Sequence, residues 1–258
     1  MKALKLALDQ SVDFGWMCVR DKAAFLRHPH VLSSLVELLL PSRAAAVGGA
    51  RADADDADPS PYADAPPRLP ASVTAARFVG ELADDCERAQ DAISNAGAVP
   101  PLVAMLADPS ESVQFAAAVA LQGLTTQSRP GPIALIRSAG GVPRLVGLLL
   151  DAEATPFDRA ACTLGNMAVE PEAAACAMQS GAARALLRTL GSPLSDEMAS
   201  TMWALQNLAT SCTAEMLDDG AVPALLACVL RHTGEHAVRA HVEVRDAAVL
   251  VLSTLACT

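Results

Sequence analysis

Apolar residues recur at helical spacing along much of the chain, and glycine and proline interrupt these runs at regular intervals. The phrase NAGAVPPLVAML at 95–106 places a glycine and two prolines directly before an apolar run. Related phrases follow as SAGGVPRLVGLLL from 138, SGAARALLRTL from 180 and DGAVPALLACVL from 219. Their glycines, Gly97, Gly140, Gly181 and Gly220, are separated by 43, 41 and 39 residues. A period of about 40 residues indicates stacked helical repeats and is too long for ankyrin or tetratricopeptide units.

A second set of segments completes each unit. These are the stretches 112–125, 157–169, 197–209 and 244–256, which are rich in alanine and carry apolar residues at helical spacing. One unit is therefore predicted to contain a short helix, a bend at glycine, a second helix that opens on proline and a long third helix. Glycine accommodates a sharp bend because it has no Cβ atom to clash. Proline in the first turn sacrifices no hydrogen bond, because that N–H group has no partner inside the helix.

Two motifs link these units to a known family. One is the phrase with glycine, Val-Pro and Leu-Val at fixed offsets, and the other is the helix end W-A-L-x-N-L-A, which runs from Trp203 to Ala209. On these residues the sequence resembles the armadillo-repeat family, most clearly over 90–258. HEAT repeats have a similar period but lack the glycine bend. The resemblance implies an all-α fold, a right-handed α-solenoid of armadillo repeats with three helices per repeat.

An earlier and more divergent unit precedes the repeats. The stretch 28–40 aligns with the second helix of the later units and 73–85 with the third helix. We therefore expect a degenerate armadillo repeat over 28–94. It is interrupted at 41–70 by an insertion rich in aspartate and proline, which is predicted to be disordered. This insertion is either a solvated loop or a tether that competes for a basic ligand.

The remaining segments complete the predicted organisation. Residues 1–27 are expected to be a remnant of a still earlier repeat or an N-terminal cap. Residues 95–258 are expected to form four repeats that start near 95, 138, 179 and 218. The chain stops on the apolar run VLVLSTLACT, whereas a solenoid needs polar surfaces at its ends. We expect that the sequence is a fragment of a longer protein or that something covers this end.

The composition of the chain argues against several classes of function. A net charge of −10 argues against a nucleic-acid partner, because phosphates require a basic surface. The lysines are confined to Lys2, Lys5 and Lys22, and no GxSxG, HExxH, GxxxxGK[ST] or GxGxxG motif is present. We therefore expect a protein that is not an enzyme and that uses no cofactor and no small-molecule substrate.

The placement of the cysteines and the hydropathy of the chain indicate the cellular compartment of the protein. The seven cysteines are scattered without a CxxC pair, which indicates buried thiols in a reducing compartment. No apolar run approaches the ~18 residues of a membrane span. We therefore expect a cytoplasmic or nuclear protein without a membrane span.

One pair of histidines is a candidate for binding a metal ion. His232 and His236 are four residues apart and would share one face of a helix. No cysteine lies at ligand spacing from them, so the sequence favours a solvated loop between helices over a metal site.

The resemblance assigns candidate site residues on the third helices, which line the concave groove in armadillo proteins. In that family the tryptophan and asparagine of W-x-x-x-N face the ligand, and only Trp203 and Asn207 keep the full pair here. An asparagine amide both donates and accepts, so it can hold a peptide backbone of any sequence. Whether Asn207 binds a ligand or only packs within its repeat is left open by the sequence. Further candidate peptide-binding residues are Cys162 and Asn166 in the preceding repeat. Three more lie one helical turn earlier on the same face: Phe115, Asp158 and Asp246.

These residues predict a scaffold for protein–protein interaction, of the kind found among vacuolar and signalling armadillo proteins. It would bind an extended segment of a partner protein along the groove. Two alternatives remain: the substrate-recognition arm of a ubiquitin ligase whose U-box lies outside this chain, and an importin-α-like import receptor. The import receptor is the weaker alternative, because this chain retains a single Trp–Asn pair and no basic segment that would bind importin-β.

Overall fold

The fold is given by a computed structural model that describes Lys22, Leu26 and residues 29–40, 70–151, 157–190, 197–232 and 239–257. Every regular element within these residues is a helix, which confirms the all-α prediction. Among them no single helix is long and apolar enough to cross a membrane, although one bent pair, Pro130–Ser138 with Gly141–Leu150, passes on length and composition.

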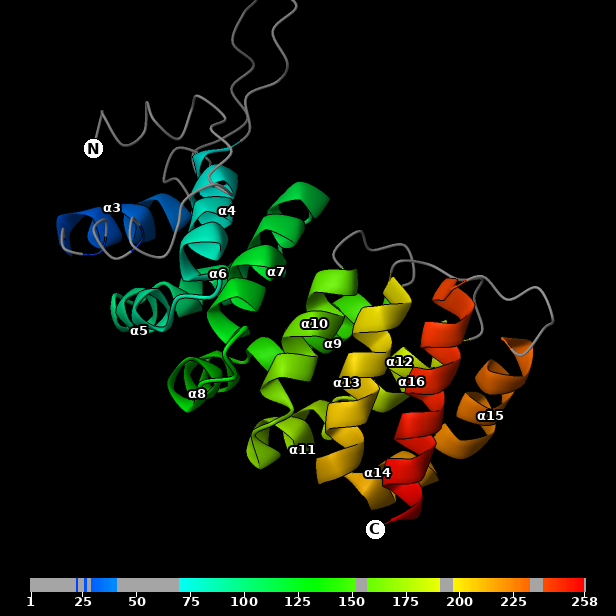
Figure 1. Cartoon of the computed structure of the whole chain (residues 1–258). Coiled ribbons are helices and arrows are strands. Elements are labelled where there is room, and N and C mark those ends of the chain that lie inside the picture. The colour runs from blue at the N-terminus through cyan, green and yellow to red at the C-terminus, as the bar shows by residue number, and fades with distance from the viewer. Residues whose placement is uncertain are drawn as a thin grey trace, which may run out of the picture.

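The long third helices form one continuous row. They are α4 (Ala71–Ala83), α7 (Glu111–Thr125), α10 (Phe157–Met167), α13 (Glu197–Ser211) and α16 (Arg239–Ala256). Each packs against the next along the chain, so the row runs from one end of the molecule to the other (Figure 1). We call its outer surface, the side chains that these helices direct away from the second helices, the third-helix face.

Shorter helices pack behind and beside this row. The second helices are α3 (Pro29–Leu39), α6 (Val99–Met105), α9 (Gly141–Leu150), α12 (Ala182–Thr189) and α15 (Ala221–Arg231). The first helices are α5 (Glu87–Asn95), α8 (Pro130–Ser138), α11 (Pro171–Gln179) and α14 (Thr213–Asp218). Within each unit the second helix packs against the third, as α6 does on α7 and α15 on α16. The described units therefore have the helix order that the sequence predicts.

The bend between first and second helices depends on glycine in every complete unit. Gly97, Gly140, Gly181 and Gly220 have φ values of 85°, 74°, 88° and 80°, in the left-handed region that disfavours a side chain. Each also donates its N–H to a carbonyl in the last turn of the first helix. The prolines of the phrase follow within the first turn of the second helix, as in α6. The predicted glycine bend is confirmed.

Each second helix of the later units contributes an equivalent leucine to the core. Leu102, Leu145, Leu186 and Leu225, which occupy the same position of the repeated phrase, are fully buried. They belong to one hydrophobic cluster that extends from Leu32 to Leu255. This position of the repeated phrase therefore faces the core.

Polar contacts join neighbouring units at their edges. Gln90 is fully buried, and its Nε2 donates to the carbonyls of Ala83 and Gly123 and to the hydroxyl of Thr126. This side chain therefore fixes the carboxyl ends of both α4 and α7 from α5. Arg129 pairs with Glu87 at 2.6 Å on the surface, where such an ion pair contributes little to stability.

The α4–α7 contact is unusually close. A Cβ atom on Gly123 would lie 2.5 Å from the backbone oxygen of Gly80, so the two helix backbones meet without an intervening side chain. Gly147 on α9, in contrast, has no atom within 4 Å of such a Cβ.

The predicted boundaries of the repeats stay predictions, and several fall on residues outside the described part of the chain. This applies to residues 1–27, apart from Lys22 and Leu26, and to the insertion at 41–70, apart from Pro70.

We predict that Leu225→Ala lowers the free energy of unfolding by about 2–5 kcal/mol, because it leaves a cavity in the core. The adjacent Leu226 provides a matched control on the same helix, since 48% of its surface is exposed whereas Leu225 has 0%. Leu226→Ala should change stability by less than about 0.5 kcal/mol. Urea denaturation of both variants measures this, and equal losses would contradict the assigned core.

We also predict opposite effects of two glycine substitutions. Gly123→Ala should destabilise the protein by about 1–3 kcal/mol, because the new methyl group forces α4 and α7 apart. Gly147→Ala should stabilise it by about 0.5–1 kcal/mol, because alanine loses less backbone entropy in a helix and meets nothing there. Thermal unfolding followed by circular dichroism gives the sign of each change. Stabilisation by both would show that the helices are not in close contact.

Candidate functional site

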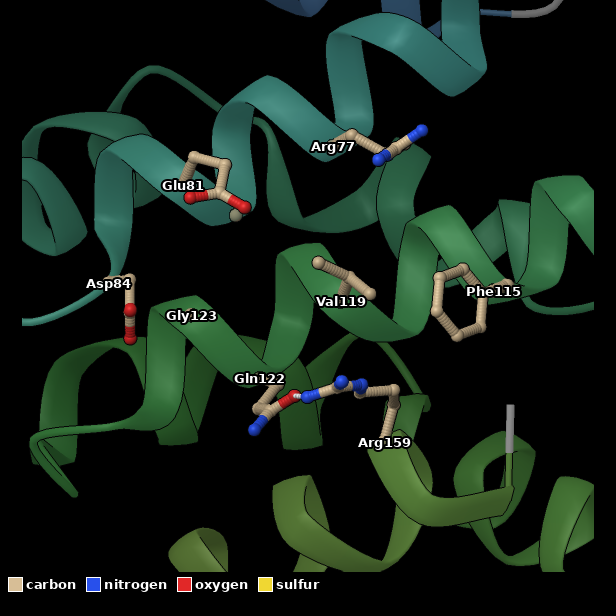
Figure 2. Close-up of a pocket in the computed structure, with 9 residues that line it drawn as sticks. Arg77, Glu81, Asp84, Phe115, Val119, Gln122, Gly123 and Arg159 are labelled. Atoms are coloured by element: carbon tan, nitrogen blue, oxygen red, sulfur yellow. Dashed lines mark hydrogen bonds between the residues drawn. The ribbon is translucent and has the colours of Figure 1, made fainter. Parts of the chain in front are cut away.

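A cavity of about 280 Å³ opens on the third-helix face across α4, α7 and α10 (Figure 2). Phe115 and Val119 of α7 form its apolar part. Gly123 stands in this unit where the next two units have Asn166 and Asn207, and it contributes no side chain. The cavity thus lies where the repeat replaces bulky or polar groups with small ones.

Charged groups of both signs surround this cavity. Arg77 and Glu81 come from α4, Asp84 follows that helix, and Arg159 reaches in from α10 (Figure 2). The Arg159 guanidinium donates to the Gln122 side-chain oxygen at 3.0 Å. The cavity therefore presents separate cationic and anionic groups rather than a single sign of charge.

Trp203 forms a second part of the third-helix face, on α13. It is 47% exposed, and a Cβ atom on Gly165 would lie 2.5 Å from its Cδ1. The indole thus lies directly against α10, at a position where only glycine leaves room. Its Nε1 donates to the Asn166 Oδ1 at 3.2 Å, so packing and a hydrogen bond both orient the ring.

The two candidate asparagines make contacts between repeats. The Asn207 Nδ2 donates to the Gly165 carbonyl at 2.9 Å, which ties α13 to α10. The Asn166 Nδ2 donates to the Thr125 hydroxyl at 3.5 Å, while its oxygen accepts from Trp203. The described residues provide no partner for the Asn207 Oδ1, so this amide keeps an acceptor that Asn166 does not.

Asp158 and Cys162 are bound into a small network. The Ser200 hydroxyl donates to the Asp158 carboxylate and accepts from the Cys162 thiol at 3.2 Å. Burial raises the pKa of the Cys162 thiol, the Asp158 charge raises it further, and the hydrogen bond to Ser200 opposes both. Asp158 also lies 3.8 Å from the Arg159 Nε. The carboxylate is therefore already hydrogen-bonded and paired within the protein.

The predicted site residues separate into two groups and one outlier. Cys162, Asn166, Trp203 and Asn207 lie together at the α10–α13 contact, and Asp158 joins them through Ser200. Phe115 belongs instead to the cavity on α7. Asp246 lies on α16, where its carboxylate accepts from Arg245 at 2.7 and 2.9 Å.

Sequence reasoning did not assign several polar residues of the face. Arg77 and Glu81 occupy the register of the Trp–Asn pair, a signal that the sequence carries. Arg159, Gln122 and Ser200 have no such signal, because their importance comes from side chains that reach across to the neighbouring repeat.

A second cavity, of about 420 Å³, lies between α5–α6 and α8–α9, away from the third helices. Val99, Val103 and Leu135 are among its apolar lining residues. The Ser94 hydroxyl is buried there without a hydrogen-bond partner among the described residues. Its lining includes one charged side chain, that of Arg144, whereas four charged side chains line the cavity on the third-helix face.

The histidine pair falls only partly within the structure. His232 ends α15 and is buried rather than solvated, so that part of the prediction is wrong. His236 lies outside the described residues. Within the described part of the chain, no group of three or more His, Cys, Asp or Glu side chains is arranged to hold a metal ion.

Comparison with known proteins identifies the repeated unit. The Armadillo/beta-catenin-like repeat matches residues 86–126, which span α5, α6 and α7. Residues 86–126 therefore form an armadillo repeat. No curated protein sequence matches it.

Solved structures extend the armadillo assignment to the whole fold. An engineered protein is 26% identical over 99% of this chain and 91% of its own, with a TM-score of 0.78. A designed armadillo repeat protein in complex with the peptide (KR)4 is 23% identical over 98% of this chain and 92% of its own, with a TM-score of 0.75. Computationally designed armadillo repeat proteins for modular peptide recognition are 21% identical over 98% and 94% of the two chains, again with a TM-score of 0.75. These matches confirm the predicted α-solenoid of armadillo repeats.

We predict that Cys162 reacts more slowly with iodoacetamide at pH 7.4 than the exposed Cys257 does. The raised pKa leaves less Cys162 thiolate at neutral pH, and the thiolate is the nucleophile. The rate should climb as the pH rises through that pKa, and Asp158→Asn should accelerate it by removing a nearby negative charge. Mass spectrometry of tryptic peptides gives both rates, and equal labelling at pH 7.4 would contradict the network.

Proposed function

We propose that this protein is a non-enzymatic scaffold that binds an extended segment of a partner protein on its third-helix face. The observation that carries the proposal is the half-exposed Trp203, which Gly165 and Asn166 hold in a fixed orientation next to Asn207. A rigid and accessible aromatic ring beside polar amides is typical of an interface hot spot. The armadillo fold is itself generally a binding scaffold without catalytic activity.

The solved structures add support at the level of the fold. A designed armadillo repeat protein is known in complex with a peptide, and others were designed for peptide recognition. The shared solenoid makes the same kind of ligand a reasonable proposal for this chain.

We infer which residue binds the partner's backbone from the side-chain atoms that are available for hydrogen bonding. The Asn207 oxygen and one of its N–H groups have no partner among the described residues, and they suit the N–H and C=O groups of one peptide unit. Asn166 would have to give up a bond to Trp203 or Thr125 before it could do the same. We therefore propose Asn207 as the principal backbone-binding residue, and Trp203 as the wall against which a partner's side chain packs.

Narrower assignments receive no support from the described residues. A ubiquitin-ligase arm or an import receptor would be distinguished by segments other than this face. The single Trp–Asn pair continues to argue against a repeated binding ladder.

The test begins with selection of binding peptides from a displayed random library, followed by fluorescence polarisation on the best binder. Trp203→Ala should weaken binding by about 2 kcal/mol or more, or roughly thirtyfold. Asn207→Ala should weaken it by about 1–3 kcal/mol. It should also lower stability by about 1 kcal/mol, because its bond to the Gly165 carbonyl is lost.

Leu226→Ala is the matched control, since Leu226 is an exposed apolar residue on α15. Measurements are made well below the melting temperature of each variant. The proposed site is wrong if Trp203→Ala and Asn207→Ala both bind the selected peptide as tightly as the parent protein.

A further inference from the structure

Some charged side chains of the third-helix face are paired with other side chains of the protein, whereas others have no such partner among the described residues. The two acids that the sequence singles out are both engaged within the protein: Asp158 by Ser200 and Arg159, and Asp246 by the neighbouring Arg245. A basic ligand would have to compete with these contacts. Neither acid is therefore an open site for a lysine or arginine side chain.

Arg77 differs from these two acids in its contacts with the rest of the protein. It is exposed on α4 at the edge of the 280 Å³ cavity, and its guanidinium forms no ion pair or hydrogen bond with the described residues. Glu81, four residues later on the same helix, is not paired with it. An Arg–Glu pair in this order is the weaker arrangement on a helix, worth only a few tenths of a kcal/mol. Arg77 is therefore free to meet a ligand at little cost.

Arg159 brings a second cation to the same cavity. Its Nη1 donates to the neutral side-chain oxygen of Gln122, and among the described residues its one carboxylate contact is the 3.8 Å contact of its Nε with Asp158. Arg77 and Arg159 reach in from helices on either side of α7, so Phe115 and Val119 lie between them (Figure 2). This arrangement combines an apolar surface with a guanidinium on each side.

The acids of the cavity lie toward its other end. Glu81 and Asp84 are separated from Phe115 along α4 and beyond it (Figure 2). They repel an acidic side chain that approaches there and accept hydrogen bonds from a ligand backbone. An acidic side chain is therefore directed to the Phe115 end of the cavity.

The net charge of −10 does not prevent this local preference. At physiological ionic strength, charges are largely screened beyond about 8 Å. The groups that contact the ligand then decide which side chain is accepted, while the overall charge slows association of an acidic partner.

We propose that the Phe115 end of this cavity selects partner segments that carry an acidic side chain next to an apolar one. The acidic group meets Arg77 or Arg159, and the apolar group packs on Phe115 and Val119. This proposal rests on the proposed function, since it names the chemistry of the segment that the third-helix face binds. It assigns this part of the face a ligand of opposite charge to the (KR)4 peptide of the designed relative.

The experiment compares library selections against three forms of the whole protein. The first is the parent, the second carries Arg77→Gln and Arg159→Gln, and the third is a control with Arg88→Gln and Arg188→Gln. The control removes the same charge from exposed arginines on α5 and α12 that do not line the cavity. Circular dichroism melting establishes that all three forms fold alike. A fourth form, with Arg77→Lys and Arg159→Lys, keeps the charge if the glutamine variant unfolds.

We expect Asp and Glu beside apolar residues to be enriched on the parent and on the control, and this enrichment to disappear in the Arg77→Gln, Arg159→Gln form. The best acidic peptide should lose about tenfold in affinity for that form. The same peptide with Gln and Asn in place of its acids should bind all forms equally. The lysine form should retain part of the acidic enrichment.

Three outcomes overturn the proposal. Selection of basic or uncharged peptides on the parent would remove the acidic preference while leaving the proposed function intact. Acidic enrichment that is equal on the parent and on the Arg77→Gln, Arg159→Gln form would place the cation elsewhere. Failure of any peptide to be enriched on the parent would remove the proposed function together with this inference.

Discussion

The molecule depends on the close side-by-side packing of its third helices. Small residues are frequent among the fully buried positions of these helices, among them Ala76, Ala117, Ala161 and Ala204, and glycine lies at the contacts of Gly80 with Gly123 and of Gly165 with Ala204. Small side chains bring helix backbones together, and buried area then accumulates over a long contact rather than in a few large side chains. Because each third helix packs against the next one in the row, the third-helix face is a continuous surface whose local character can change from one repeat to the next.

The shape and the chemistry of the third-helix face change from one repeat to the next. Where the α4–α7 contact is closest, at Gly80 and Gly123, the surface is hollowed and charged. At the next contacts Gly165 makes room for Trp203, and the surface becomes an aromatic ring flanked by amides. Glycine thus acts in opposite ways at related positions: it lets two backbones meet in one repeat, and it seats a large ring in another. The resulting face would hold different side chains of one extended partner at different repeats.

The sequence predicts the fold well because its signals are local. A left-handed glycine such as Gly140 and a buried leucine such as Leu145 depend on the backbone and periodicity of their own repeat. The candidate site is predicted only in part. Trp203 and Asn207 are recognised by their spacing, but the bond from Asn207 to the Gly165 carbonyl joins groups 42 residues apart. The same holds for Asp158, whose availability is decided by Ser200 on the next helix. Contacts between repeats are set by how the helices stack, and no short motif encodes them.

The buried Gln90 side chain has a consequence for how this surface could evolve. It lies behind the third helices and holds the carboxyl ends of α4 and α7 through three acceptors at once. The spacing of the two helices that border the charged cavity is thus maintained by a residue that no ligand touches. Specificity at the front of the solenoid is therefore open to adjustment from its interior, by substitutions that leave every ligand-contacting side chain unchanged.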